Sequence, residues 1–118
     1  MGVRQVLGSW GEDLAVQHLE ERGYDVLARN WRCRDGELDV VARLGQVLCF
    51  VEVKTRSGLA FGEPAEAVTW QKQRNLRLLA GRWLTAHRPT GWSEIRFDVI
   101  GVLRAADGPQ VTHLEGAF

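Results

Sequence analysis

The sequence predicts an α/β fold in which a mixed β-sheet of about five strands is flanked by helices. Segments with helical and strand periodicity follow one another in the order α-β-β-β-α-β-β, without a repeat or a linker. The uninterrupted apolar run Leu48–Val51 is typical of a strand that is buried on both faces. Since 118 residues of ordinary composition are enough for one core, we predict a single domain over residues 1–118.

The first predicted helix covers residues 8–22. Ser9 is a suitable N-cap, Glu12 follows it at capping-box spacing, and Gly23 ends the helix. On a helical wheel, Glu12 lies at the centre of a small apolar stripe that faces the core. Its carboxylate is therefore either the partner of Ser9 in a capping box or a member of a functional site.

Two further features of this part of the chain leave alternatives open. Trp10 and Leu14 lie off the apolar stripe, which indicates packing on another element or on the second copy of a homodimer. After a short strand at residues 24–28, a basic connector at 29–34 contains Trp31. Positive charge beside an aromatic ring can bind nucleic acid. A solvated loop with one buried tryptophan is the alternative.

The rest of the chain is arranged around a predicted β-hairpin. Its strands, residues 37–42 and 47–54, are joined by Gly45-Gln46, where glycine supplies the positive φ that a two-residue loop needs. With this turn, Asp39 lies opposite Glu52. Glu37 lies opposite Lys54, and all four of these side chains share one face.

Two carboxylates that face each other at the end of a buried strand need a compensating charge. Directly opposite Cβ atoms are only about 4.5–5.5 Å apart, and like charges there are destabilising. A hard divalent cation such as Mg²⁺ takes carboxylate and carbonyl oxygens as ligands, and it would relieve the repulsion between Asp39 and Glu52. The alternative is a surface hairpin in which Glu37 and Lys54 form a salt bridge and the other two acids are solvated.

The second half of the chain predicts a basic helix. Glycine-rich residues 55–64 predict a mobile loop at the mouth of the acidic site, followed by a helix over residues 67–87. From Ala67 to Pro89 there is no acidic residue, which indicates either contact with phosphates or a solvated helix face, two alternatives that the sequence leaves equally open. The predicted nucleic-acid-binding residues are Arg56, Lys72, Arg74 and Arg77. Strands over residues 95–103 and 111–114 complete the fold.

The composition excludes several classes of function. Fifteen basic and fifteen acidic residues give no net charge, so attraction to a polyanion has to come from the distribution of charge. Cys33 and Cys49 lack metal-binding spacing and indicate reduced thiols in a cytoplasmic protein, and the three histidines are scattered and do not predict a zinc site. No apolar run approaches the ~20 residues of a membrane span and no signal peptide is visible, so no membrane association is expected.

The hairpin motif resembles that of a known group of nucleases. Asp39, twelve residues and then Glu52-Val53-Lys54 resemble the PD-(D/E)xK motif of restriction-endonuclease-like nucleases, with Leu38 in place of the proline. A wider set of motifs, spread over essentially the whole chain, is similar to the bacterial YraN-like family, itself similar to archaeal Holliday-junction resolvases. These motifs are Gly11-Glu12, Arg29-Asn30, Gly36-Glu37-Leu38-Asp39, Phe50 to Arg56, Arg96-Phe97-Asp98-Val99 and Ala117-Phe118.

The resemblance implies a restriction-endonuclease-like fold and an endonuclease that needs Mg²⁺ or Mn²⁺ and acts on DNA, branched junctions included. It implies that Asp39, Glu52 and the Val53 carbonyl bind the metal ion, and that Glu12 completes the site from the first helix. Lys54 would position or activate the attacking water and offset charge on the scissile phosphate. Lesser candidates are Glu37 and Gln71.

Two other classes of function remain open from the sequence. One is a nucleic-acid-binding module whose acidic cluster is vestigial, such as an adaptor in recombination or repair. The other is a structural protein in which a cation only holds the hairpin. The intact set of Asp39, Glu52 and Lys54 favours the enzyme, because a decayed site would be expected to lose its lysine first.

Overall fold

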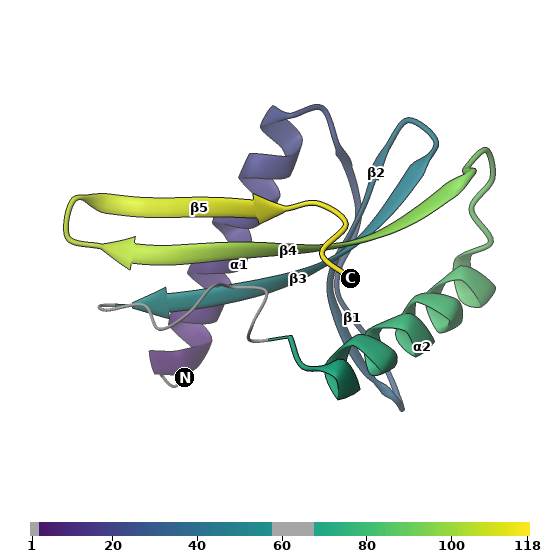
Figure 1. Ribbon diagram of the computed structural model, residues 1–118, viewed down its shortest axis with the longest axis horizontal. Coiled ribbons are helices and arrows are strands. Elements are labelled where there is room, and N and C mark those ends of the chain that lie inside the picture. The colour runs from purple at the N-terminus through teal and green to yellow at the C-terminus, as the bar shows by residue number, and fades with distance from the viewer. Residues whose placement is uncertain (1–2, 58–67) are drawn as a thin grey trace.

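The computed structural model has the order of elements that the sequence predicts (Figure 1). It describes residues 3–57 and 68–118, and the side chains of residues 8–57 and 68–118. The two described helices are α1 (Val3–Glu21) and α2 (Trp70–His87). The described strands are β1 (Asp25–Cys33), β2 (Gly36–Leu44), β3 (Val47–Ser57), β4 (Glu94–Ala105) and β5 (Gly108–Leu114).

The strands form one mixed sheet in the order β1-β2-β3-β4-β5. Neighbouring strands are antiparallel except for β3 and β4, which are parallel. A parallel pair cannot be joined by a tight turn and needs a crossover connection, which here contains α2. The predicted fold class is confirmed, and the arrangement is consistent with a restriction-endonuclease-like fold.

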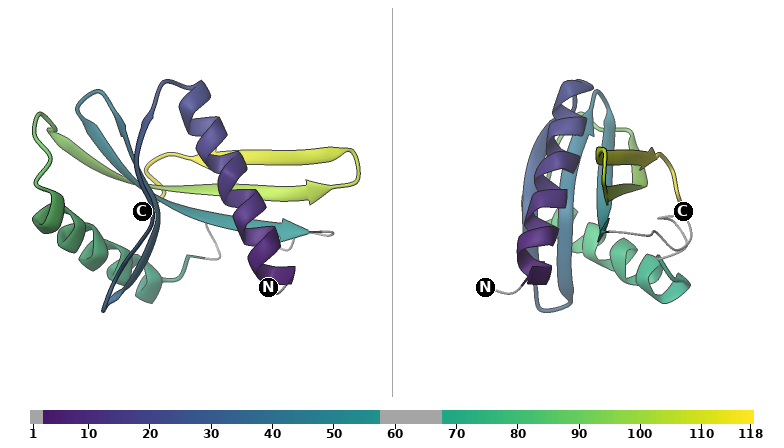
Figure 2. Two further views of the ribbon diagram at one scale, coloured as in Figure 1. Left: turned by 180° about the vertical axis from the view of Figure 1, so that it is seen from behind. Right: turned by 90° about the vertical axis from the view of Figure 1, so that its left-hand side faces the viewer.

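The two helices cover opposite faces of the sheet (Figure 2). On the α2 side, Leu79 and Trp83 belong to the same buried cluster as Phe50, whereas on the α1 side Leu19 belongs to the same cluster as Val51. Consecutive residues of β3 therefore enter different cores. The predicted apolar run of this strand is buried on both faces, and none of its four residues is more than 2% exposed.

α1 begins earlier than the sequence predicted. Since the helix starts at Val3, Ser9 lies inside it and is not the N-cap, so the predicted capping box with Glu12 is wrong. Residues 3–7 contain neither glycine nor proline, and nothing in them stops the helix from extending upstream. The predicted end is confirmed, because Gly23 has a φ of 86° in a Schellman cap after the last turn.

A glycine lets α1 approach β3 closely. A Cβ atom at Gly11 would lie 2.9 Å from the Cβ of Thr55 on β3, too close for any side chain at this position without a shift of the helix. Because α1 can sit this low on the sheet, the next residue, Glu12, comes within electrostatic range of Asp39 on β2.

β1 is longer than predicted, and the predicted basic connector at residues 29–34 is wrong. Residues 29–33 continue β1 and pair with β2. The side chains of Arg29 and Arg32 are exposed, whereas Trp31 and Cys33 pack against the α2-side core. Asn30 has a φ of 52°, a left-handed conformation that asparagine tolerates better than most residues.

The remaining bounds differ modestly from the predictions. Thr69 caps α2 by accepting a hydrogen bond from the Lys72 N–H at 3.2 Å, and the predicted start at Ala67 lies outside the described residues. β4 and β5 are both longer than predicted, because the turn between them consists only of residues 106–107.

Several smaller predictions can also be compared with the structure. Trp10 and Leu14 pack against the α1-side core, so the first of their two predicted alternatives holds. Cys33 and Cys49 are free thiols in cores on opposite faces of the sheet. Neither of the described helices is long and apolar enough to cross a membrane.

Candidate active site

The predicted carboxylate pair lies where two strands separate. β2 and β3 pair in the predicted register as far as Val40–Val51, and Gly45 at the turn has the expected positive φ of 59°. Beyond that pair, β2 continues beside β1 while β3 continues beside β4 (Figure 1). We call this point of separation the fork. Asp39 and Glu52 are the first residues of the two strands past the last pair, so both lie at the fork.

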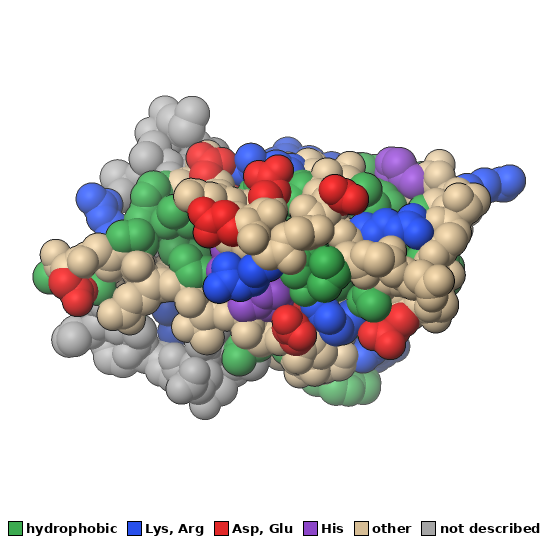
Figure 3. All heavy atoms as spheres, turned by 90° about the horizontal axis from the view of Figure 1, so that it is seen from above, with side chains coloured by type: hydrophobic (Ala, Val, Ile, Leu, Met, Phe, Trp, Pro, Cys, Tyr) green, Lys and Arg blue, Asp and Glu red, His purple; other side chains and the backbone are tan. Residues whose placement is uncertain are grey.

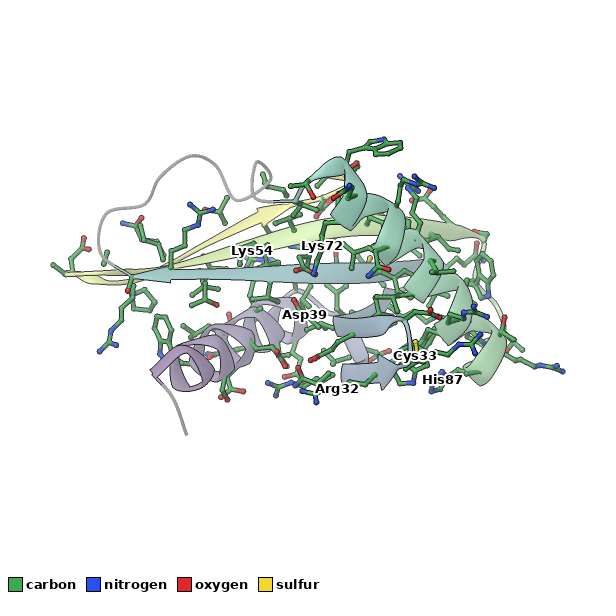
Figure 4. The ribbon with its side chains drawn as sticks, turned by 90° about the horizontal axis from the view of Figure 1, so that it is seen from below. Arg32, Cys33, Asp39, Lys54, Lys72 and His87 are labelled. Carbon is green, nitrogen blue, oxygen red and sulfur yellow. The ribbon has the colours of Figure 1, made fainter. Side chains whose placement is uncertain are left out.

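Glu52 is 5% exposed and meets two lysines. The Nζ atoms of Lys54 and Lys72 lie 3.4 Å and 3.5 Å from the same oxygen, Oε1 of Glu52. Lys54 follows on β3 as predicted, whereas Lys72 comes from the first turn of α2. Figure 4 shows the two lysines next to each other beside β3, with Asp39 close to them. Lys72, which the sequence predicted only as a phosphate-binding residue, is thus part of the acidic site.

Asp39 on β2 is hydrogen-bonded to the backbone of β3. Its Oδ2 accepts a hydrogen bond of 2.9 Å from the N–H of Val53. Burial and the neighbouring charge of Glu52 raise the pKa of Asp39 to about 7, although the Val53 hydrogen bond acts in the opposite direction. At neutral pH this carboxyl group is only partly ionised, and a cation beside it would favour the ionised form. The Val53 carbonyl as a metal ligand stays a prediction.

Glu12 is buried near the fork but has polar partners of its own. Its Oε1 accepts a hydrogen bond of 2.7 Å from Asn30 Nδ2 and lies 3.4 Å from a guanidinium nitrogen of Arg29. Its charge also contributes to the raised pKa of Asp39. Within residues 3–57 and 68–118, no three His, Cys, Asp or Glu side chains converge closely enough to hold a metal ion by themselves. The part of Glu12 in the metal site therefore stays a prediction.

Asn30 is a residue that the sequence reasoning did not assign a role. It presents its amide to Glu12 from a backbone position with positive φ, which is rare in a strand for residues other than glycine. Together with Glu12 it lines an open hollow of about 490 Å³, whose other lining residues are Gly8, Ser9 and Arg32. Only the Arg29-Asn30 pair among the sequence motifs pointed to this position.

The two lesser candidates lie elsewhere. Glu37 forms an ion pair of 3.1 Å with Arg32, its partner across β1 and β2, so the alternative salt bridge between Glu37 and Lys54 is wrong. Because the strands separate at the fork, β1 and not β3 becomes the neighbour of this part of β2. Gln71 lines a separate open hollow on α2.

The predicted phosphate-binding arginines lie on two elements. On α2, the guanidinium of Arg74 lies 4.8 Å from the ring centre of Trp70, and that of Arg77 lies 4.7 Å from the ring centre of Phe97. Arg56 belongs to β3, because residues 55–57 continue that strand and do not start the predicted loop. The rest of the predicted loop, residues 58–64, lies outside the described residues.

Charge is distributed unevenly over the molecule. On the face shown in Figure 3, acidic and basic side chains are mixed, so no field of one sign can form there. The helix α2, in contrast, carries basic side chains and not a single Asp or Glu. The charge on α2 is therefore of the sign that a phosphate backbone would complement.

A second buried polar centre surrounds Asp98, which is 0% exposed. Its carboxylate accepts hydrogen bonds of 2.9 Å from two nitrogens of Arg96 and of 3.0 Å from the N–H of Gly116, and it lies 2.8 Å from Nε2 of His113. Nδ1 of His113 lies 3.1 Å from Nε2 of His18. Two of the three histidines are thus in contact, and the prediction that they are scattered is wrong for that pair.

Comparison with known proteins identifies the family of the chain. The family described as "Uncharacterised protein family UPF0102" matches residues 11–102, which is well over half of the sequence. The chain belongs to this family. A UPF0102 protein of Acidothermus cellulolyticus is 51% identical over 98% of this chain and 95% of its own length. Others, from Beutenbergia cavernae and Frankia alni, are 53% and 52% identical, and each alignment covers at least 98% of both chains.

UPF0102 is the family of the YraN-like proteins, so the resemblance inferred from the motifs is confirmed. The matched range includes all four predicted catalytic residues, Glu12, Asp39, Glu52 and Lys54. The family description specifies no reaction.

The donor set of this UPF0102 protein fits a hard divalent cation. Mg²⁺ is usually held by one or two carboxylates together with waters and substrate phosphates, and it does not require a cage made only of protein ligands. Asp39 and Glu52 supply two such carboxylates, and a bound cation would offset the burial and the charge of Glu52 that raise the pKa of Asp39. Neither cysteine is at the fork, so the donors favour Mg²⁺ or Mn²⁺ over a thiolate-bound metal.

Proposed function

We propose that this UPF0102 protein is a Mg²⁺- or Mn²⁺-dependent endonuclease that hydrolyses phosphodiester bonds in DNA, branched DNA included. The observation that carries the proposal is the convergence of Asp39, Glu52, Lys54 and Lys72 at the fork. Carboxylates that can hold a cation and ammonium groups that can meet a phosphate are the two charges this hydrolysis requires.

Each residue at the fork has a distinct role in the proposed reaction. Asp39 and Glu52 would hold the cation, which supplies a water of lowered pKa and neutralises charge that develops on the phosphate. If Glu52 held the cation, the ammonium groups of Lys54 and Lys72 that now pair with Glu52 would be available for the negatively charged substrate. Lys54 would orient or activate the attacking water, and Lys72 would bind a non-bridging oxygen of the scissile phosphate.

A direct assay tests this function. The purified protein is incubated with duplex, single-stranded, flapped and four-way-junction DNA, each with Mg²⁺, Mn²⁺ or EDTA. We expect cleavage of at least one substrate with a metal ion and none with EDTA. Activity that persists in EDTA would contradict the metal-dependent mechanism.

One observation favours a second candidate, a nucleic-acid-binding module without catalysis. The ion pairs from Lys54 and Lys72 already compensate Glu52, so the protein can fold with this site free of metal. In that case DNA would bind to the protein with equal affinity in EDTA and in Mn²⁺, and no substrate would be cleaved. The same panel of substrates therefore separates the two candidates.

The metal site makes a prediction about thermal stability. Mn²⁺ or Mg²⁺ is expected to raise the melting temperature of the wild type, because an ion that binds only the folded state stabilises it by mass action. Asp39→Asn should abolish this gain, while its amide oxygen can still accept the hydrogen bond from Val53. Differential scanning fluorimetry over a wide range of Mn²⁺ concentrations measures the effect. An unchanged melting temperature of the wild type would count against the site.

Asp39 also predicts how the stability of the metal-free protein depends on pH. In the unfolded chain its pKa is about 4, whereas in the folded protein it is raised to about 7. Between these values the folded state binds more protons than the unfolded state, so the free energy of unfolding falls as pH rises. Asp39→Asn should remove this fall and be more stable than the wild type by about 1–3 kcal/mol at pH 7. Urea unfolding in EDTA from pH 4 to pH 8 tests the sign.

The arginines of α2 predict the salt dependence of DNA binding. Each neutralised phosphate contributes a slope of about −0.9 in a plot of log affinity against log salt concentration. Arg74→Ala combined with Arg77→Ala should therefore weaken duplex binding and flatten the slope by about 1.8. Arg82→Ala is the matched control on the same helix, because Arg82 is already paired with Asp35 at 3.0 Å. If the double variant keeps the affinity and the salt slope of the wild type, Arg74 and Arg77 do not contact phosphates and belong to a solvated helix face.

A further inference from the structure

Trp70 at the start of α2 is exposed to an unusual extent. It is 67% exposed, whereas the other exposed large hydrophobic residues of the described chain range from 37% to 46%. An indole left in water gives up the stabilisation of roughly 1.5–3 kcal/mol that burying a large apolar side chain provides. Most of this stabilisation is therefore not realised at Trp70.

The surroundings of Trp70 are suited to a flat, negatively charged ligand. Arg74, one turn further along α2, places its guanidinium 4.8 Å from the centre of the indole ring. Beside it lies an open hollow of about 410 Å³ that is lined by Gln71, Arg74, Asn75 and Leu78. An aromatic face, a guanidinium and side-chain amides together can stack a nucleobase, contact its phosphate and hydrogen-bond its edge.

The same helix turn connects this surface to the acidic site. Lys72, two residues after Trp70, reaches Glu52 at the fork. Two residues rise only about 3 Å along a helix whose diameter with side chains is about 10–12 Å, so Trp70 and the fork lie on either side of one helical turn. Trp70 is also the first residue of α2, where the positive end of the helix dipole favours negative charge.

We propose that Trp70 and Arg74 form a stacking platform for an unpaired base of the substrate, about one helix diameter away from the phosphate that binds at the fork. In an intact duplex each base is covered by its neighbours, whereas single-stranded segments, flaps and junctions offer an unstacked base. The platform thus selects DNA that contains unpaired nucleotides. This inference deepens the proposed nuclease function and rests on it for the link to cleavage, but binding by the platform can be measured separately.

The test measures binding in EDTA, where no cleavage can occur. We compare a fluorescein-labelled single-stranded oligonucleotide with a fully paired hairpin duplex by fluorescence anisotropy. Trp70→Ala is expected to weaken single-strand binding by roughly five- to a hundred-fold and duplex binding by less than about two-fold. Trp70→Phe, which keeps an aromatic face, should retain most of the affinity. Trp92→Ala is the matched control, because Trp92 is 37% exposed and its Nε1 donates to the Pro89 carbonyl.

A second readout uses the indole itself. Addition of the unlabelled oligonucleotide should quench part of the tryptophan fluorescence of the wild type and of Trp92→Phe, and this part should be missing in Trp70→Phe. Quenching that is unchanged in Trp70→Phe would overturn the platform.

The remaining outcomes also decide the question. A wild type that does not bind single strands, or a Trp70→Ala variant that loses single-strand and duplex affinity equally, would overturn the platform. So would a shift from dimer to monomer in Trp70→Ala with unchanged DNA affinity, which would assign this surface to self-association. If single-strand binding depends on Trp70 but no substrate is cleaved, the platform is supported and the nuclease function is contradicted. If the wild type cleaves DNA and Trp70→Ala cleaves it with full activity, the nuclease function is supported and the platform is contradicted.

Discussion

Lys54→Ala is expected to lower the rate of DNA cleavage by about 10²–10⁴-fold, the range for loss of a group that assists proton transfer in the transition state. The ammonium group lies 3.4 Å from Oε1 of Glu52, and only 28% of the side chain is exposed, so its charge is held at the fork. The substitution removes no carboxylate, and the fold and divalent-metal binding should remain close to those of the wild type. Single-turnover cleavage at saturating Mn²⁺ measures the effect.

Two variants control this experiment. Lys54→Met keeps much of the side-chain volume and should be as slow as Lys54→Ala. Lys72→Ala removes a cation that is equally close to Glu52 but comes from α2 and is 41% exposed, so it should weaken substrate binding more than it slows the reaction. Wild-type cleavage in Lys54→Ala would point to a contaminating nuclease. A wild type without activity on branched, flapped or single-stranded DNA, with either metal, would favour the binding module.

The sequence was sufficient for the part of the site that depends on local pairing. A two-residue turn at Gly45 sets the register of β2 against β3, and the register brings Asp39 to Glu52. The alternation of side chains along a strand then places Lys54 on the same face as Glu52. Each of these steps needs only the hairpin, which is why they could be predicted before the structure was known.

The parts that the sequence did not predict depend on contacts between distant elements. Whether β2 stays beside β3 or turns away with β1 is decided by the extension of β1, whose basic residues were interpreted as a loop. Lys72 enters the site because α2 crosses from β3 to β4 and docks at the fork. Asn30 meets Glu12 only because Gly11 lets α1 lie close to the sheet. The pattern of residues around each of these positions does not predict such contacts, because the partners are far apart in the sequence.

The buried polar centre around Asp98 also depends on contacts between distant elements. Its loss is the second large effect that we expect. Asp98→Ala is expected to destabilise the protein by about 3–5 kcal/mol, because it leaves the partly buried guanidinium of Arg96 without its buried carboxylate partner. Burial alone would raise the pKa of Asp98, but hydrogen bonds from His113, Arg96 and Gly116 hold it below its ordinary value. This stabilisation is therefore present above about pH 4 and is lost as pH falls through the lowered pKa.

The size of the effect follows from what the carboxylate connects. Asp98 joins β4 to β5 through His113 and to the C-terminal residues through Gly116, and Arg96 donates a 2.6 Å hydrogen bond to the hydroxyl of Tyr24, just after α1. Urea unfolding at pH 7 measures the loss, with Asp98→Asn as the milder variant should the alanine variant fail to fold.

Glu115→Ala is the matched control for Asp98. Glu115 pairs with the same Arg96 at 3.6 Å, but its side chain is 60% exposed, and exposed pairs contribute less than about 1 kcal/mol. If burial is the cause of the large effect, Asp98→Leu combined with Arg96→Met should be more stable than either single variant, because it removes the unpaired charge together with its partner. A loss in Asp98→Ala no larger than that in Glu115→Ala would show that the buried carboxylate does not hold these elements together.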